Sequence, residues 1–172
     1  KDGLAEMTIL APNGRKVAAF SAPEPVTLGM RQFRFESPEP VDLASLKAAY
    51  PEGEYIFSGK TFSGTMLAGR ATLSHRLPPI ATIVSPALDA HGVPAGNLQV
   101  TWRAAAGLAS CIVEIKQEDT GANVTARLPG SSTSFVPPKG FLAAGTKYKV
   151  AVGTVGLEGN ISFVETRFST VK

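Results

Sequence analysis

The sequence is poor in charged residues, and its charge is not concentrated anywhere. Charged residues make up 18% of the 172 residues, with 17 basic against 14 acidic side chains and a formal net charge of +3. The longest basic group is the pair Arg15-Lys16, whereas proteins that bind nucleic acid carry clusters or stripes of lysine and arginine. We therefore expect no nucleic-acid partner.

Cysteine is almost missing as well. The single cysteine, Cys111, rules out an internal disulfide and lies in the apolar run Cys111-Ile112-Val113, where we expect a buried thiol that packs as a small hydrophobic side chain. A catalytic thiol needs a positioned base, and neither His75 nor His91 is near Cys111 in the sequence. We therefore predict no reactive cysteine.

Long apolar runs are also missing. No run approaches the roughly 20 residues that a helix needs to span a bilayer, so we expect no integral membrane segment. The chain begins at Lys1 rather than at a methionine. We interpret this start as the result of processing that removed an export signal, and we predict a periplasmic or secreted location.

Glycine and proline, in contrast, are abundant. The 17 glycines and 13 prolines fall at regular intervals between short runs of β-forming residues, a pattern typical of all-β proteins. The consecutive prolines of Leu77-Pro78-Pro79 favour a stiff, extended segment. We therefore predict a mainly β protein with two domains, residues 1–77 and 80–172. The second domain has the size of one seven-stranded sandwich.

The second domain contains seven strand-like runs separated by turn signals. In one of them Tyr148, Val150 and Val152 alternate with residues of the opposite face, as in a half-buried strand. A tyrosine at the start of such a strand, directly after a corner, can direct its hydroxyl back to upstream backbone. The core candidates of the last run are Ile161, Phe163 and Phe168. The predicted strands lie at residues 80–86, 98–102, 112–116, 124–128, 134–136, 148–152 and 161–168.

Several features of this domain together resemble a fibronectin type III domain. They are Pro86, the strand that ends at Trp102, Leu142 with the following Gly-Thr-x-Tyr-x-Val-x-Val run, and the Gly159-Asn160-x-Ser162 hairpin. The resemblance covers residues 80–172. It implies an immunoglobulin-like β-sandwich that acts as a binding or spacer module and not as an active site.

The first domain is predicted to be a small β-rich unit with one short helix. Asp42 can cap a helix near residues 42–50, in which Leu43, Leu46 and Tyr50 share one face, and Pro51 ends it. An Asn-Gly turn at Asn13-Gly14 joins two short strands. The predicted strands of this domain lie at residues 7–10, 17–20, 26–35, 55–59 and 66–73.

Aromatic and acidic residues near the end of this helix form the candidate site. Tyr50, Tyr55 and Phe62 are candidates for an aromatic platform that binds carbohydrate, although Tyr55 and Phe57 share strand parity and are more simply core. Glu52 and Glu54 flank a glycine beside Tyr50 and Tyr55. Paired carboxylates can perform acid–base chemistry on sugars, but a solvated turn at the helix exit is the simpler interpretation.

Histidine offers a weaker candidate. His75 and His91 lie on either side of the predicted linker, with Asp89 near the second, and two histidines with one aspartate can bind zinc. Structural zinc motifs show tighter spacing and more ligands, so we expect packing or hydrogen-bonding roles instead. We predict no metal and no cofactor.

We therefore predict a non-enzymatic, exported bacterial protein that serves as an interaction or structural module. Its partner would be a protein or a glycan, and homo-oligomerisation through an exposed edge strand is a further prediction. The alternative is a carbohydrate- or small-ligand-binding accessory domain. Its candidate site residues are Tyr50, Glu52, Tyr55, Phe62 and His75.

Overall fold

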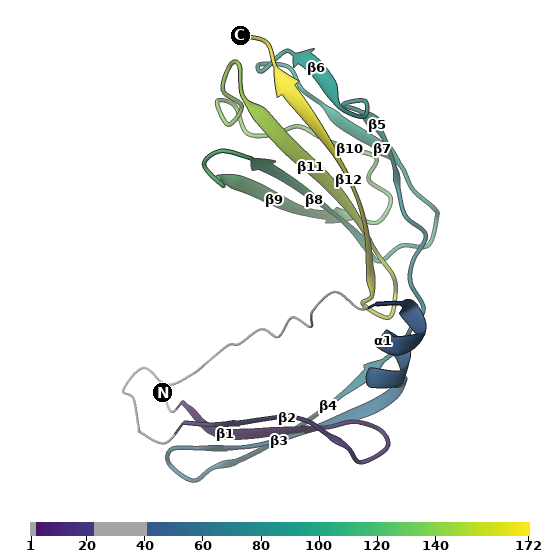
Figure 1. The fold of residues 1–172 in the computed structure, drawn as a ribbon, viewed down its shortest axis with the longest axis vertical. Coiled ribbons are helices and arrows are strands. Elements are labelled where there is room, and N and C mark those ends of the chain that lie inside the picture. Colours follow the sequence, from purple (N-terminus) through teal and green to yellow (C-terminus); the bar gives the residue numbers. More distant parts are fainter. Residues whose placement is uncertain (1–2, 23–40) are drawn as a thin grey trace. The chain divides into compact units, whose positions relative to one another are not determined.

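The computed structural model describes residues 3–22 and 41–172 of the chain, and its described part is mainly β (Figure 1). The chain separates into two compact units, Lys1–His75 and Arg76–Lys172. The prediction of an all-β fold is confirmed. No helix in the described ranges is long and apolar enough to cross a membrane.

The first unit contains one antiparallel sheet with the strand order β2-β1-β3-β4. Paired residues on its antiparallel strands share a face, which separates an apolar face with Ile9, Phe57 and Tyr55 from a polar face with Thr8 and Ser58. The prediction at residues 26–35 lies outside the described residues. The strands are β1 (Leu4–Leu10), β2 (Lys16–Ser21), β3 (Gly53–Thr61) and β4 (Met66–Leu73).

The predicted helix is present as α1 (Leu43–Ala49). The Asp42 carboxylate accepts a hydrogen bond from the Ser45 N–H at 2.6 Å, and hydrogen bonds from Ser45 hold the pKa of Asp42 below its usual value. The face shared by Leu43, Leu46 and Tyr50 is not buried, because α1 has no buried residue and Leu43 is 55% exposed. A seven-residue helix is therefore maintained by its two ends rather than by packing of one face.

The second unit is a sandwich of two sheets. Three strands with the order β10-β7-β5 form one sheet, and five strands with the order β6-β12-β11-β8-β9 form the other. Figure 1 shows these strands in the upper part of the view, from teal to yellow. The strands are β5 (Thr82–Ser85), β6 (Ala90–Val93), β7 (Val100–Arg103), β8 (Ser110–Gln117), β9 (Asn123–Pro129), β10 (Ser134–Phe135), β11 (Lys147–Val155) and β12 (Ile161–Thr170).

The inward faces of both sheets form a contiguous apolar core. Trp102 of the smaller sheet is 2% exposed, and Tyr148, Val150 and Val152 of the larger sheet are fully buried. The Tyr148 hydroxyl accepts a hydrogen bond from the Ala143 N–H at 2.8 Å and donates to the Phe141 carbonyl at 3.4 Å. The prediction of a hydroxyl that turns back to upstream backbone is confirmed.

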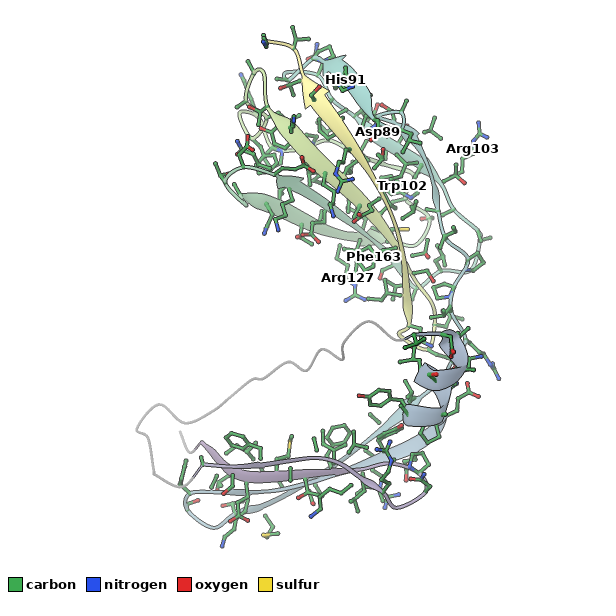
Figure 2. The ribbon with its side chains drawn as sticks, in the orientation of Figure 1. Asp89, His91, Trp102, Arg103, Arg127 and Phe163 are labelled. Carbon is green, nitrogen blue, oxygen red and sulfur yellow. The ribbon has the colours of Figure 1, made fainter. Side chains whose placement is uncertain are left out.

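Two details of the larger sheet differ from the prediction. In β12 the even-numbered residues point inward, so Phe168 is buried, whereas Ile161 and Phe163 are 38% and 51% exposed. The Phe163 ring (Figure 2) instead covers Gly153, its partner on β11, where an added Cβ would lie 2.6 Å from the ring. Strand β6, which pairs in parallel with β12, was not predicted.

The first residues of the second unit are bound to its own β-hairpin. Arg76 forms an ion pair with Glu158 at 3.0 Å, and its carbonyl accepts a hydrogen bond from the Asn160 side chain at 3.0 Å. The Thr154 hydroxyl donates to the Pro79 carbonyl at 2.8 Å. The segment with the prolines is thus part of the sandwich from its first residue onward.

Removal of the Tyr148 hydroxyl tests the importance of this corner. Tyr148→Phe leaves the Ala143 N–H without its acceptor inside the sandwich, so we expect the free energy of unfolding to fall by about 1–3 kcal/mol. Urea denaturation of the full chain measures this loss. Tyr50→Phe, which removes a hydroxyl from the other unit, is the control, and an equal loss in both variants would contradict the interpretation.

Candidate functional site

The predicted site lies where α1 ends, at a place we call the helix-exit corner (Arg15, Tyr50, Glu52, Tyr55 and His75, with the carbonyls of residues 49–51). The last carbonyls of a helix lack partners within the helix and must find others. The chain leaves α1 at Tyr50 with φ −128° and ψ 79°, and Pro51 follows. The carbonyls of residues 49, 50 and 51 are therefore aimed at neighbouring elements.

His75 provides the partner for the second of these carbonyls. It follows β4 and is half-buried. Its Nε2 lies 2.8 Å from the Tyr50 carbonyl oxygen, and because a carbonyl only accepts, Nε2 must carry the proton and donate. The His75 backbone N–H donates to the Glu52 carboxylate at 2.5 Å. The His75 side chain thus binds Tyr50 and the His75 backbone binds Glu52, so one residue contacts the turn before and after Pro51.

Tyr55 and Arg15 provide the other two partners. Tyr55 on β3 is 7% exposed, and its hydroxyl donates to the Pro51 carbonyl at 3.0 Å. Burial of the ring raises the pKa of the Tyr55 hydroxyl, so the donor stays protonated at neutral pH. The Arg15 guanidinium, from the turn between β1 and β2, donates to the Ala49 carbonyl.

Phe62 does not join this group. It follows β3 at Thr61, and the helix-exit corner lies at the other end of β3, before Gly53. A strand of nine residues spans about 30 Å at roughly 3.3 Å per residue. The structure thus brings Tyr50, Glu52, Tyr55 and His75 together but places Phe62 at the opposite end of the sheet.

The acidic residues of the corner have structural partners. Glu52 is bound to the His75 N–H, and Glu54 forms an ion pair with Arg70 at 2.8 Å across β3 and β4. Tyr55 is too deeply buried to present a flat face to a sugar ring. The arrangement connects the end of α1 to the turn between β1 and β2, to β3 and to the segment that follows β4.

The residues of the zinc hypothesis belong to different units and have other partners. His75 lies in the first unit, and His91 in the second lies with Nδ1 at 2.9 Å from the Ser169 hydroxyl. Asp89 adopts a left-handed backbone with φ 51°, and its N–H donates to Thr166. Within residues 3–22 and 41–172, no three histidine, cysteine or acidic side chains form a metal-binding group.

A surface hollow of about 340 Å³ lies beside Asp89 and His91, which Figure 2 labels. Two of its charged residues pair with one another, Arg167 Nε with Glu118 Oε1 at 2.8 Å. The hollow was not predicted from the sequence, because it depends on the pairing of β6 with β12. Strand β6 has only four residues, and these show no clear strand pattern. The lining residues are Asp89, Ala90, His91, Glu118, Lys147, Arg167, Phe168 and Ser169.

A second hollow, of about 240 Å³, lies on the apolar face of the first sheet beside Tyr55 and Phe57. Residues from β3 and β4 line it, and they include Ala71 and Leu73. Sequence reasoning did not single it out, although the alternation of Ala71 and Leu73 with polar residues in β4 was the available signal.

Cys111 is fully buried between the sheets. Desolvation is the main cause that raises the pKa of its thiol. The indole N–H of Trp102, which has no hydrogen-bond partner of standard geometry in the described part of the chain, exerts the smaller, opposite effect. A protonated, enclosed thiol is a poor nucleophile.

No family model and no curated protein matches the chain, whereas solved structures do. Among solved structures, the fibronectin(III)-like modules of CbhA from Clostridium thermocellum are 8% identical with a TM-score of 0.43, and the match covers 99% of this chain and 80% of that one. A segment of two fibronectin type III domains from chicken tenascin is 16% identical with a TM-score of 0.42, covering 99% and 86%.

The strand order and the Tyr148 corner identify the second unit as a fibronectin type III-like sandwich. Its two sheets pair as β10-β7-β5 and as β12-β11-β8-β9, with the short β6 added in parallel at the edge of β12. The resemblance seen in the sequence is thereby confirmed for this unit.

The burial of Cys111 predicts a thiol that reacts only when the sandwich opens. We expect native protein to show no reaction with a thiol reagent within minutes at pH 8, and one equivalent of reaction in denaturant. Reaction of a Thr125→Cys variant, which carries a second, exposed thiol on β9, is the positive control. Rapid labelling of native Cys111 would contradict the buried, inert thiol.

The helix-exit corner predicts that its polar residues act on stability. Glu52→Ala and His75→Ala each remove a partner of a half-buried turn, so we expect each to lower the free energy of unfolding by about 1 kcal/mol. Glu54→Ala breaks only an exposed ion pair and should cost less than about 0.5 kcal/mol. Denaturation curves of the three variants, followed through a signal of the first unit, test this order, and a larger loss for Glu54→Ala would refute it.

Proposed function

We propose that the chain is a non-enzymatic interaction or structural module of an exported bacterial protein. The observation that supports this proposal best is the helix-exit corner. There the residues that sequence reasoning had singled out as a site, Tyr55 and His75 above all, use their polar atoms to bind backbone carbonyls. Side chains committed in this way serve the fold of this corner.

The sandwich supports the same proposal from a different direction. Domains of this architecture recur in cell-surface proteins, where they act as spacers and as binding modules. Fold alone does not determine function. Several charged residues on the sandwich surface form ion pairs with each other, such as Lys149 with Glu165 at 3.0 Å and Arg167 with Glu118 at 2.8 Å.

The alternative is binding of a carbohydrate or small ligand by the first unit. The hollow beside Tyr55 and Phe57 favours it, because a shallow apolar surface of about 240 Å³ suits one face of a sugar ring. This ligand would contact Phe57 rather than Phe62, which lies at the other end of the sheet.

One experiment separates these possibilities. The purified full chain is incubated with panels of glycan, ester and peptide substrates, and binding to the same glycans is measured by calorimetry. We expect neither turnover nor binding for the module. Turnover that Glu52→Gln or Glu54→Gln abolishes would refute the proposal, whereas glycan binding that Phe57→Ala abolishes would establish the alternative.

The proposed location has its own test. A tagged form of the complete gene product, expressed in its native host, should be recovered from the periplasm or the medium. Recovery in the cytoplasm alone would overturn the exported location and leave the module proposal intact.

A further inference from the structure

The outer edge of β4 pairs with none of the strands that the structure describes. It is the last strand in the order β2-β1-β3-β4, and among the described strands at sheet edges it is the longest, with eight residues. Every residue from Met66 to Thr72 is exposed. Met66 is 72% and Leu67 46% exposed, which is high for apolar side chains.

The features that normally protect an edge strand are missing from β4. Natural edges are short, bulged, or interrupted by proline and charge. Here β5, β6 and β10 have four residues or fewer, the pairing of β2 is bulged near Leu10, and β9 carries Arg127 and ends at Pro129. Strand β4 pairs with β3 without a shift in register and contains one charged residue, Arg70, and no proline.

The hydrogen bonds of the hairpin show which backbone groups face outward. The Thr61 N–H donates to the Thr65 carbonyl at 3.0 Å, so these residues form a hydrogen-bonded pair of the antiparallel ladder. Such pairs recur at every second residue. The odd-numbered residues of β4 therefore bond to β3, whereas Met66, Ala68, Arg70 and Thr72 point their N–H and C=O groups away from the sheet.

We propose that β4 pairs with β4 of a second copy of the chain. The two sheets would join edge to edge around a two-fold axis into one continuous antiparallel sheet. This inference goes beyond the proposed function, because it concerns two copies of the chain and holds whether or not another partner binds. Edge pairing of this kind satisfies the free backbone groups and exposes no new edge of the same strand.

The side chains determine where the two-fold axis lies. If the axis is perpendicular to the sheet, the apolar faces of the two copies lie on the same side of the joined sheet. Even-numbered residues of one copy must then pair with even-numbered residues of the other, and odd-numbered with odd-numbered. With the axis at Gly69, Ala68 lies opposite Arg70 of the other copy and Met66 opposite Thr72. These are the residues with outward-facing backbone groups, and each such pair exchanges two hydrogen bonds.

The same register also fits the apolar face. Gly69 lies opposite its own counterpart in a non-hydrogen-bonded pair, the type in which side chains approach most closely. Leu67 lies opposite Ala71, a large residue against a small one.

The neighbouring registers are less favourable. An axis at Arg70 places two guanidinium groups directly opposite one another, and like charges in that position are destabilising. An axis at Ala68 extends the pairing into the turn at Gly64, whose φ is +90°, and thereby loses a hydrogen-bonded pair. In addition, Arg70 is drawn toward β3 by its ion pair with Glu54 at 2.8 Å, which leaves room for a strand beside β4.

Sedimentation equilibrium of the full chain over a wide concentration range tests the pairing. A small interface of this kind is expected to be weak, so the apparent mass should rise from 18.0 kDa toward twice that value only at high concentration. Ala68→Pro removes one outward N–H from an edge position that tolerates proline and should abolish the dimer. Retention of the native circular dichroism spectrum shows that this variant is folded.

Two charge variants test the register. Ala68→Glu places a carboxylate opposite Arg70 of the other copy and should tighten the dimer roughly fivefold. Ala68→Lys places two like charges there and should weaken it by a similar factor. Thr125→Glu and Thr125→Lys, which make the same changes on the exposed side of β9 in the other unit, are matched controls and should leave the equilibrium unchanged.

Each outcome supports or overturns the pairing of β4 or its register. Opposite effects of Ala68→Glu and Ala68→Lys, with silent controls, support pairing centred on Gly69. A strictly monomeric wild-type chain at millimolar concentration overturns the proposal, and so does a dimer that survives Ala68→Pro. Equal effects of the two charges at Ala68 overturn the Gly69 register.

Discussion

The second unit depends on how the chain enters β11, the strand that pairs on both sides in the middle of the larger sheet. The Tyr148 hydroxyl binds the Ala143 N–H, and the Thr170 hydroxyl of β12 donates to the Ala143 carbonyl at 2.6 Å. One turn is thus tied to two adjacent strands. Because a slip of one residue would turn Val150 and Val152 toward solvent, these hydroxyls help to determine which residues form the core.

Much of this unit could be predicted from the sequence because strand periodicity and turn residues repeat clearly there. The alternation around Tyr148 gave the correct face for the whole strand. It failed in β12, where Phe163 was assigned to the core on its hydrophobicity alone. The even-numbered residues of β12 face the core, so Phe163 lies on the outer face, over Gly153 of β11, which lies ten positions earlier in the chain. Tertiary context of this kind is not visible in a local pattern.

The candidate site shows a different limit of sequence reasoning. Four of the five residues predicted as a ligand site do meet near the end of α1. Their clustering arises because a short helix must end beside a sheet, with three successive carbonyls to satisfy. The sequence shows which side chains can donate hydrogen bonds, but it does not show which backbone carbonyls accept them. Phe62 follows β3 at its far end and does not meet them, because the strand is extended.

The contact between Phe163 and Gly153 makes the residue at one position depend on the residue at the other. The aromatic ring is half exposed, and a residue so exposed would ordinarily be free to change. Here the ring lies over a neighbour without a side chain, and a Cβ added at Gly153 would lie 2.6 Å from it. A larger residue at Gly153 therefore requires the Phe163 ring to turn away, so the effects of substitutions at these two positions on stability should not add.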